Sequence, residues 1–169
     1  MKFSQIPSAL LMIRPGSFGF NEQTQATNAF QVSPELNTDV QSRALEEFNR
    51  MAELLQSHDI DVRIFDDTPT PKPDAVFPNN WISFHEDGLV VLYPMMSENR
   101  RVERRMDIIE SLAGDFVIGE IIDLSSEELA GRFLEGTGSL VFDHPRQTVY
   151  ACYSPRTNEA LVLQLTSRF

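Results

Sequence analysis

The fold is decided by residues 76–93, whose sequence is VFPNNWISFHEDGLVVLY. Apolar residues dominate 76–85 and 89–93, and the turn-forming Glu86-Asp87-Gly88 lies between these two runs. An Asp-Gly pair flanked by apolar runs is a strong hairpin signal, because glycine adopts the backbone angles that a tight turn requires. The two runs are therefore predicted to form antiparallel strands.

A helix and a third strand are expected after this hairpin. The helix is indicated by an apolar stripe at helical spacing: Val102, Met106, Ile109, Leu112 and Ala113. Gly114 stands where a C-terminal cap would lie, and residues 116–122 are typical of the next strand. The predicted order is strand, strand, helix, strand, which is a ββαβ unit.

The same order begins again at Phe133, 56 residues after Phe77. Residues 139–143 and 148–153 predict a second hairpin, and residues 157–165 predict the beginning of a helix. Repetition at this period indicates an array of α/β units. Because the chain ends at Phe169 before a closing strand, we expect residues 1–169 to be the N-terminal part of a longer domain.

The residues before the first hairpin predict a smaller α/β segment. Residues 9–14 and 61–65 are typical of strands, and the apolar spacing between Val40 and Leu55 predicts an amphipathic helix. Thr38 or Asp39 is placed to cap this helix. The proline-rich residues 68–74 predict an extended connector.

Composition restricts the partners and the location. The chain is 41% hydrophobic, which is typical of a globular protein, and it carries 14 Lys and Arg against 25 Asp and Glu. A net charge of −11 repels phosphate backbones and anionic lipids, so we expect no nucleic-acid or membrane partner. The apolar run at residues 9–13 is too short for a signal peptide or a membrane span, which favours a cytoplasmic protein.

Cys152 is the one cysteine, so an internal disulfide is excluded, and the Cys and His spacings match no structural zinc site. The flanking sequence VYACY predicts a strand in which Cys152 is buried and inert. His58, His85 and His144 show no evident pairing with this thiol. The sequence therefore contains no complete Cys-His catalytic apparatus.

Three motifs place polar groups where strands should be apolar: Asn79-Asn80, Glu135 and Arg156. Adjacent amides on a strand point to opposite faces, so at least one of Asn79 and Asn80 should face inward. That amide either ties down a neighbouring turn, which is the more common case, or recognises a ligand.

Glu135 precedes Gly136-Thr137-Gly138, small residues that allow close approach of a backbone or ligand. Its carboxylate could bind a cation or orient a histidine, or it could be a solvated turn residue. Arg156 is suited to gripping a carboxylate, with Thr157 placed to cap the next helix. The arginines within residues 100–105 favour a solvated helix face with ion pairs over a basic binding patch.

Four ordered segments, PDAVFPNNW, YPMMSENRRVER, FLEGTGSLVFD and YSPRTNEA, resemble the motifs of the guanidino-group-modifying, or pentein, superfamily. The likeness covers nearly all of the chain and is nearest to bacterial amidinotransferase-family proteins described as citrulline hydrolases, which MIRPGSFGFNEQT also matches. It implies an α/β-propeller of five ββαβ units, of which this chain would hold about two and a half.

The resemblance also implies catalysis without a metal or organic cofactor, by a cysteine that attacks the guanidino or ureido carbon and a histidine that transfers protons. Glu135 matches the family's glutamate that contacts the histidine or the substrate, and Arg156 matches an arginine near the substrate carboxylate. The family's catalytic Cys and His lie in the C-terminal half, and Cys152 matches neither.

Asn80 stands where arginine- and dimethylarginine-processing relatives carry an aspartate. A guanidinium is a cation that needs an anion, whereas an amide matches a neutral ureido group without burying an unpaired charge. We therefore expect a C–N hydrolase with a citrulline-like amino-acid substrate, in which Glu135 is catalytic and Asn79, Asn80 and Arg156 bind the substrate.

The alternatives are an arginine deiminase, dimethylargininase or amidinotransferase activity, or a non-catalytic half-propeller that acts in binding or assembly. The 169 residues alone are expected to be inactive. Self-association into a homo-oligomer would complete an open sheet edge.

Overall fold

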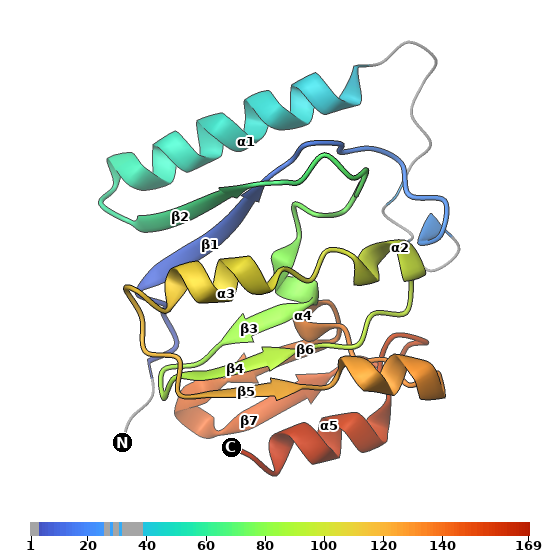
Figure 1. Cartoon of the computed structure of the whole chain (residues 1–169). Coiled ribbons are helices and arrows are strands. Elements are labelled where there is room, and N and C mark those ends of the chain that lie inside the picture. The colour runs from blue at the N-terminus through green and yellow to red at the C-terminus, as the bar shows by residue number, and fades with distance from the viewer. Residues whose placement is uncertain (1–3, 26–27, 29–30, 32–38) are drawn as a thin grey trace. The chain divides into compact units, whose positions relative to one another are not determined.

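The computed structural model describes residues 4–25, 28, 31 and 39–169. They form two compact units, one of residues 7–78 and the other joining the residues before Pro7 to Asn79–Phe169. The first unit is coloured blue to green in Figure 1, and most of the second is green to red.

The first unit has the predicted strand, helix, strand order: β1 (Ala9–Arg14), α1 (Val40–Ser57) and β2 (Asp61–Asp66). β1 and β2 pair in parallel, and α1 runs along this pair and buries Phe48 and Ala52 (Figure 1). The side chain of Asp39 caps α1 by accepting a hydrogen bond from the Ser42 amide. Thr38, the other predicted cap, lies outside the described residues.

The second unit contains the predicted ββαβ order. Its first sheet has β3 (Ile82–Phe84) antiparallel to β4 (Leu89–Leu92), and β4 parallel to β5 (Glu120–Asp123). The helices α2 (Glu98–Arg101) and α3 (Met106–Leu112) lie between β4 and β5 in the chain. Gly88 has a φ of +83°, as the predicted hairpin turn requires.

Several predicted boundaries in this sheet are wrong. The strand predicted over residues 76–85 is restricted to β3, and the one predicted over 116–122 is displaced to β5. The predicted single helix is broken, and Val102 and Met106 of its apolar stripe are 54% and 47% exposed. Within this break, Glu103 and Arg104 form ion pairs with Arg100 and Glu128.

The second hairpin, β6 (Leu140–Asp143) and β7 (Thr148–Ala151), is antiparallel as predicted. A short helix, α4 (Gly136–Ser139), precedes it and includes Ser139, which was predicted to be in the strand. The 3₁₀ helix η3 (Ser125–Ala130) lies between β5 and α4 in the chain, and the 3₁₀ helix η4 (His144–Arg146) lies between β6 and β7.

The helix α5 (Glu159–Thr166) follows the second hairpin. Its N-cap is Asn158, whose Oδ1 accepts a hydrogen bond from the Leu161 amide at 3.2 Å. The predicted cap, Thr157, is wrong, because its hydroxyl lies 3.0 Å from that of Ser154 instead.

One apolar core joins the two hairpins of the second unit. It contains side chains from β4, β6 and α5 and from the segments between them: Leu89, Val91, Tyr93, Leu124, Leu134, Leu140, Leu161 and Leu165. Packing β4 and β6 against one core brings the segments that precede β3 and β6 within reach of each other. Those segments contain Asn79-Asn80 and Glu135.

Candidate functional site

Asn79 and Asn80 lie in a 3₁₀ helix, η2 (Pro78–Asn80), directly before β3 and not on the predicted strand. Pro78 explains the difference, since its fixed φ and missing N–H favour a tight turn. The Asn79 side-chain amide donates to the Thr137 hydroxyl at 2.7 Å. Asn79 therefore links η2 to the Gly136-Thr137-Gly138 segment. Tying down a neighbouring turn is one of the two alternatives that the sequence offered for Asn79 and Asn80.

The two glycines of that segment permit the close approach. Gly136 has a φ of +25°, and a Cβ there would collide with the carbonyl oxygen of Asn79. A Cβ on Gly138 would lie 2.7 Å from Nδ2 of Asn80 and 3.8 Å from Cβ of Glu135. The amide of Asn80 thus lies beside the turn that Glu135 opens.

Glu135 is buried, with 1% of its surface exposed, which excludes the alternative of a solvated turn residue. Its Oε1 accepts a hydrogen bond from the Met96 amide at 3.1 Å. Its Oε2 accepts none within the described part of the chain, although Nη1 of Arg156 lies 3.6 Å away. A buried carboxylate with one guanidinium beside it and an oxygen still able to accept is suited to binding an N–H group.

The backbone fixes Arg156 next to Glu135. The carbonyl of Arg156 accepts hydrogen bonds from the Glu135 amide at 3.2 Å and from the Ser139 hydroxyl at 2.8 Å. Leu134 and Thr157 form a bridge beside these bonds. The structure therefore brings together all four predicted residues, Asn79, Asn80, Glu135 and Arg156, which we call the Glu135 cluster.

A network of ion pairs that the sequence did not reveal supports this cluster. Arg104 binds Glu128 through contacts of 2.5 and 2.9 Å, and Glu128 also accepts from the Met95 amide at 2.7 Å. Arg101 donates to the carbonyls of Met95 and Met96. Because the Met96 amide bonds to Glu135, the network holds the segment that orients the catalytic candidate.

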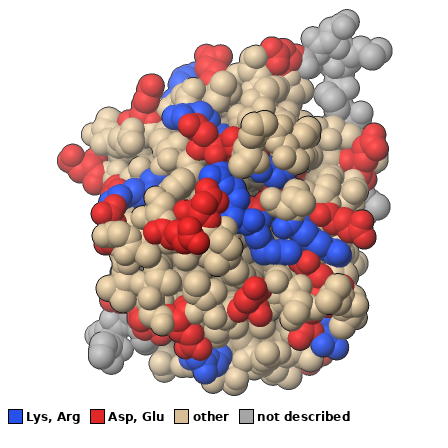
Figure 2. Space-filling model, viewed as in Figure 1, with Lys and Arg blue, Asp and Glu red and all other residues tan. Residues whose placement is uncertain are grey.

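The prediction of a solvated arginine face is wrong in part. Arg100 and Glu103 are 4% and 3% exposed and form a two-point ion pair. Their spacing of three residues was visible in the sequence, but their burial depends on the fold. Acidic and basic side chains lie intermixed on the face that Figure 2 shows.

Cys152 is exposed, which contradicts its predicted burial. β7 ends at Ala151, so the alternation that would turn Cys152 inward stops one residue before it. Across the residues that the structure describes, no group of three or more His, Cys, Asp or Glu side chains is arranged to hold a metal ion. The described helices include none with the length and apolar character needed to cross a membrane.

A protein-family model described as N,N dimethylarginine dimethylhydrolase, eukaryotic, matches residues 14–169. The chain belongs to this family. It is thereby a member of the pentein guanidino-modifying superfamily, as the motifs predicted. A comparison with curated proteins finds no match.

Solved structures agree with this membership. The dimethylargininase (DDAH) of Pseudomonas aeruginosa, a mutant complexed with citrulline, is 17% identical with a TM-score of 0.65, and the match covers 96% of this chain and 58% of that one. The N-terminal domain of ArgZ, a cyanobacterial arginine dihydrolase, bound to substrate, is 18% identical with a TM-score of 0.68, covering 94% and 53%. AgrE in complex with L-arginine is 20% identical with a TM-score of 0.65, covering 94% and 22%.

These matches confirm the predicted α/β fold class of the pentein enzymes. The chain spans 56% and 58% of the length of two dimethylargininase structures that it matches. The roles assigned to Asn79, Asn80, Glu135 and Arg156 stay predictions, as does the cytoplasmic location.

Proposed function

We propose that this family member carries the substrate-recognition residues of an enzyme that hydrolyses a C–N bond in a ureido or guanidino amino acid, with a citrulline-like substrate preferred. One observation carries the proposal: the Glu135 cluster places a buried carboxylate, a neutral amide and a guanidinium together. The reaction class is supported by the family description and by relatives whose structures contain citrulline or L-arginine.

Each group of the cluster has a role in this proposal. The Arg156 guanidinium binds the substrate carboxylate, and the Asn80 amide supplies a donor and an acceptor to the planar nitrogen-rich group. The free lone pairs of Glu135 Oε2 accept from an N–H of that group or from a catalytic histidine. Asn79 positions the turn through Thr137.

The chemistry itself requires a cysteine and a histidine from outside these 169 residues. A cysteine thiolate attacks the ureido or guanidino carbon, and the C–N bond breaks as the histidine protonates the departing nitrogen. Water, deprotonated by the same histidine, then attacks the covalent intermediate and releases the thiolate. Cys152 is given no part in these steps.

Charge balance is the reason to favour a neutral substrate group. Asn80 brings no anion to the planar group of the substrate. A guanidinium beside this amide would lack a paired anion there, whereas a neutral ureido group matches the donor and the acceptor of the amide without burying an unpaired charge.

Hydrolysis of N,N-dimethylarginine is the second candidate, because the matching family model is described by that reaction. The two candidates differ in the charge that the substrate brings to Asn80. An Asn80→Asp substitution supplies the anion that a guanidinium needs, so it should convert one preference into the other.

Calorimetric titration of the 169-residue chain with citrulline, arginine and N,N-dimethylarginine tests the proposal. We expect citrulline to bind most tightly, and Asn80→Asp to shift the ratio of affinities toward arginine by about tenfold or more, equivalent to about 1.4 kcal/mol. Asn49→Asp makes the same charge change in the other compact unit, and it should leave the order of the three affinities unchanged. Tighter binding of dimethylarginine by the unaltered chain would replace the proposal with the second candidate.

A further inference from the structure

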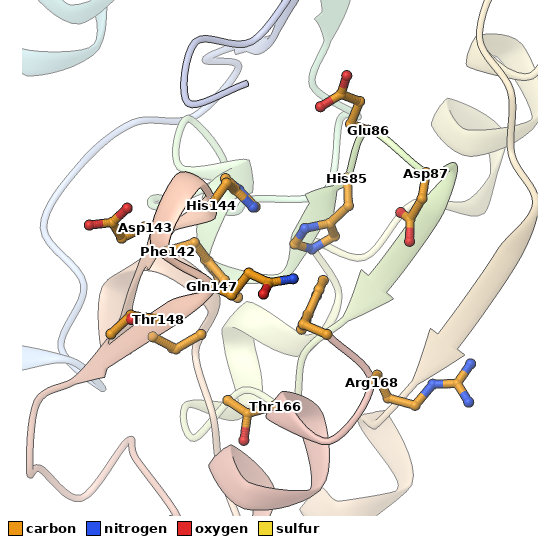
Figure 3. Close-up of a pocket in the computed structure, with 12 residues that line it drawn as sticks. His85, Glu86, Asp87, Phe142, Asp143, His144, Gln147, Thr148, Thr166 and Arg168 are labelled. Carbon is orange, nitrogen blue, oxygen red and sulfur yellow. The ribbon is translucent and has the colours of Figure 1, made fainter. Parts of the chain in front are cut away.

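A cavity of about 360 Å³ lies at the opposite ends of β3 and β6 from the Glu135 cluster (Figure 3). β3 starts shortly after Asn80 and ends next to His85, and β6 starts after Ser139 and ends next to His144. The lining contains His85 and His144 but no residue of the Glu135 cluster. The cavity is therefore a separate hollow in the second unit, and its interpretation does not depend on the proposed function.

Aromatic rings form much of its wall. The ring of His85 lies 4.7 Å from that of Phe169 and 5.3 Å from that of Phe142, measured between centroids. Phe142 and His144 are nearly parallel, with an interplanar angle of 8°. Such walls favour flat aromatic guests, because aromatic pairs gain attraction from stacked and edge-to-face geometry beyond the area they bury.

Polar side chains face the same space. Figure 3 shows the side chains of His85, His144 and Gln147 turned toward one another across the cavity. Gln147 has a φ of +51°, a left-handed conformation that glycine or asparagine adopts at lower cost. A long carboxamide is thus held, at some cost in backbone energy, where it can offer a donor and an acceptor to a guest.

His85 contributes a further unused group. Its Nε2 lies 2.9 Å from the Ser83 hydroxyl, whereas its Nδ1 is buried and has no hydrogen-bond partner within the described residues. Burial, followed by the neighbouring His144, lowers the pKa of His85 to about 4, so this ring is neutral at pH 7.

The charged residues of the lining select against anions. Glu86 and Asp87 stand at the mouth and point away from the centre in Figure 3. The lining cation Arg168 is paired with Glu120, and Arg146 beside the cavity is paired with Asp143. Within the described residues, Glu86 and Asp87 accept hydrogen bonds from backbone amides only, so a phosphate or carboxylate guest would meet their negative charge while Arg168 and Arg146 are already paired.

We propose that this cavity binds a neutral, planar nitrogen heterocycle of one or two rings, the chemical class of the nucleobases. The rings of His85, Phe142 and Phe169 contact its faces and edges, and the Gln147 carboxamide pairs with adjacent donor and acceptor atoms on its rim. The free base and the nucleoside fit this chemistry, and the nucleotide is disfavoured by its phosphate.

Titrating the ¹⁵N-labelled 169-residue chain with adenine, adenosine and adenosine monophosphate tests the proposal by NMR. We expect adenine and adenosine to shift the signals of Phe142, Gln147 and the His85 ring nitrogens, and the monophosphate to bind about tenfold more weakly. Indene, which has a similar shape without polar atoms, should also bind more weakly than adenine.

Variants identify the recognising group. Gln147→Gly removes the carboxamide at a backbone conformation that glycine adopts without strain, so the fold should persist while adenine affinity falls about tenfold. Gln164→Ala removes an exposed carboxamide from α5, outside the lining, and should leave the affinity unchanged. The proposal fails if adenine at its solubility limit leaves the cavity signals of the folded chain unmoved, if indene binds as tightly, or if the monophosphate binds best.

Discussion

Gly136 lets the Glu135 cluster assemble, since a side chain at this position would collide with the Asn79 carbonyl. We expect Gly136→Ala to lower the free energy of unfolding by about 3 kcal/mol, from positive-φ strain of about 1–2 kcal/mol plus the collision. Gly131→Ala is the matched control, because Gly131 has a φ of +66° but open space around it.

Denaturant unfolding of the two variants separates strain from collision. Gly131→Ala should cost about 1–2 kcal/mol, the strain alone. Equal losses for both variants would mean that η2 does not press against Gly136.

Local pattern singled out Glu135 and its flanking glycines as a candidate site, and the resemblance to the pentein superfamily implied that Asn80 replaces an aspartate. The burial of Glu135 could not be predicted, because it depends on Met96 and Arg156, which lie far from it along the chain. The burial predicted for Cys152 was wrong because β7 ends at Ala151, so Cys152 lies one residue beyond the strand that was expected to bury it.

At the scale of elements, the N-cap of α5 shows which of two neighbouring residues, Thr157 or Asn158, stabilises the start of the helix. Asn158→Ala removes the side-chain acceptor for the Leu161 amide and should cost about 1 kcal/mol of stability. Thr157→Ala removes only a hydroxyl that pairs with Ser154, so it should cost less than half as much. Thermal or denaturant unfolding of both variants measures the difference, and a larger loss for Thr157→Ala would restore the cap predicted from sequence.

Elements with one clear periodicity were predicted accurately, and those shaped by distant partners were not. β1, α1 and β2 matched their predicted ranges because each combines a regular apolar pattern with a local cap or turn. The predicted strand before His85 was shortened because Pro78 starts a 3₁₀ turn. The helix predicted across Val102 was interrupted where Arg104 engages Glu128, a residue 24 positions away.

At the scale of the whole molecule, repetition in the sequence predicted the α/β class and the succession of hairpins. The boundary between the two compact units lies between Pro78 and Asn79, shortly after the proline-rich connector predicted over residues 68–74. The cavity beside His85 could not be predicted, because it is lined by segments from two hairpins and the end of α5. Local patterns determine elements, whereas cavities arise only from how the elements pack.

Acid stability is a property of the whole molecule to which His85 makes a separable contribution. As the pH falls from 7 toward the sequence pI of about 4.6, the net charge of −11 shrinks and self-repulsion weakens. His85 acts in the opposite direction. Its pKa is about 4 in the fold against 6.5 ordinarily, so between these values the unfolded chain binds a proton that the folded chain does not.

The stabilisation linked to His85 is therefore complete above about pH 6.5 and is lost as the pH falls to about 4. Relative to the unaltered chain, His85→Phe should lose less stability across this range, by on the order of 2 kcal/mol. Urea unfolding of the unaltered chain and of His85→Phe at intervals from pH 7 to 4 measures the two profiles, and parallel profiles would show that the His85 ring titrates in the fold as it does in water.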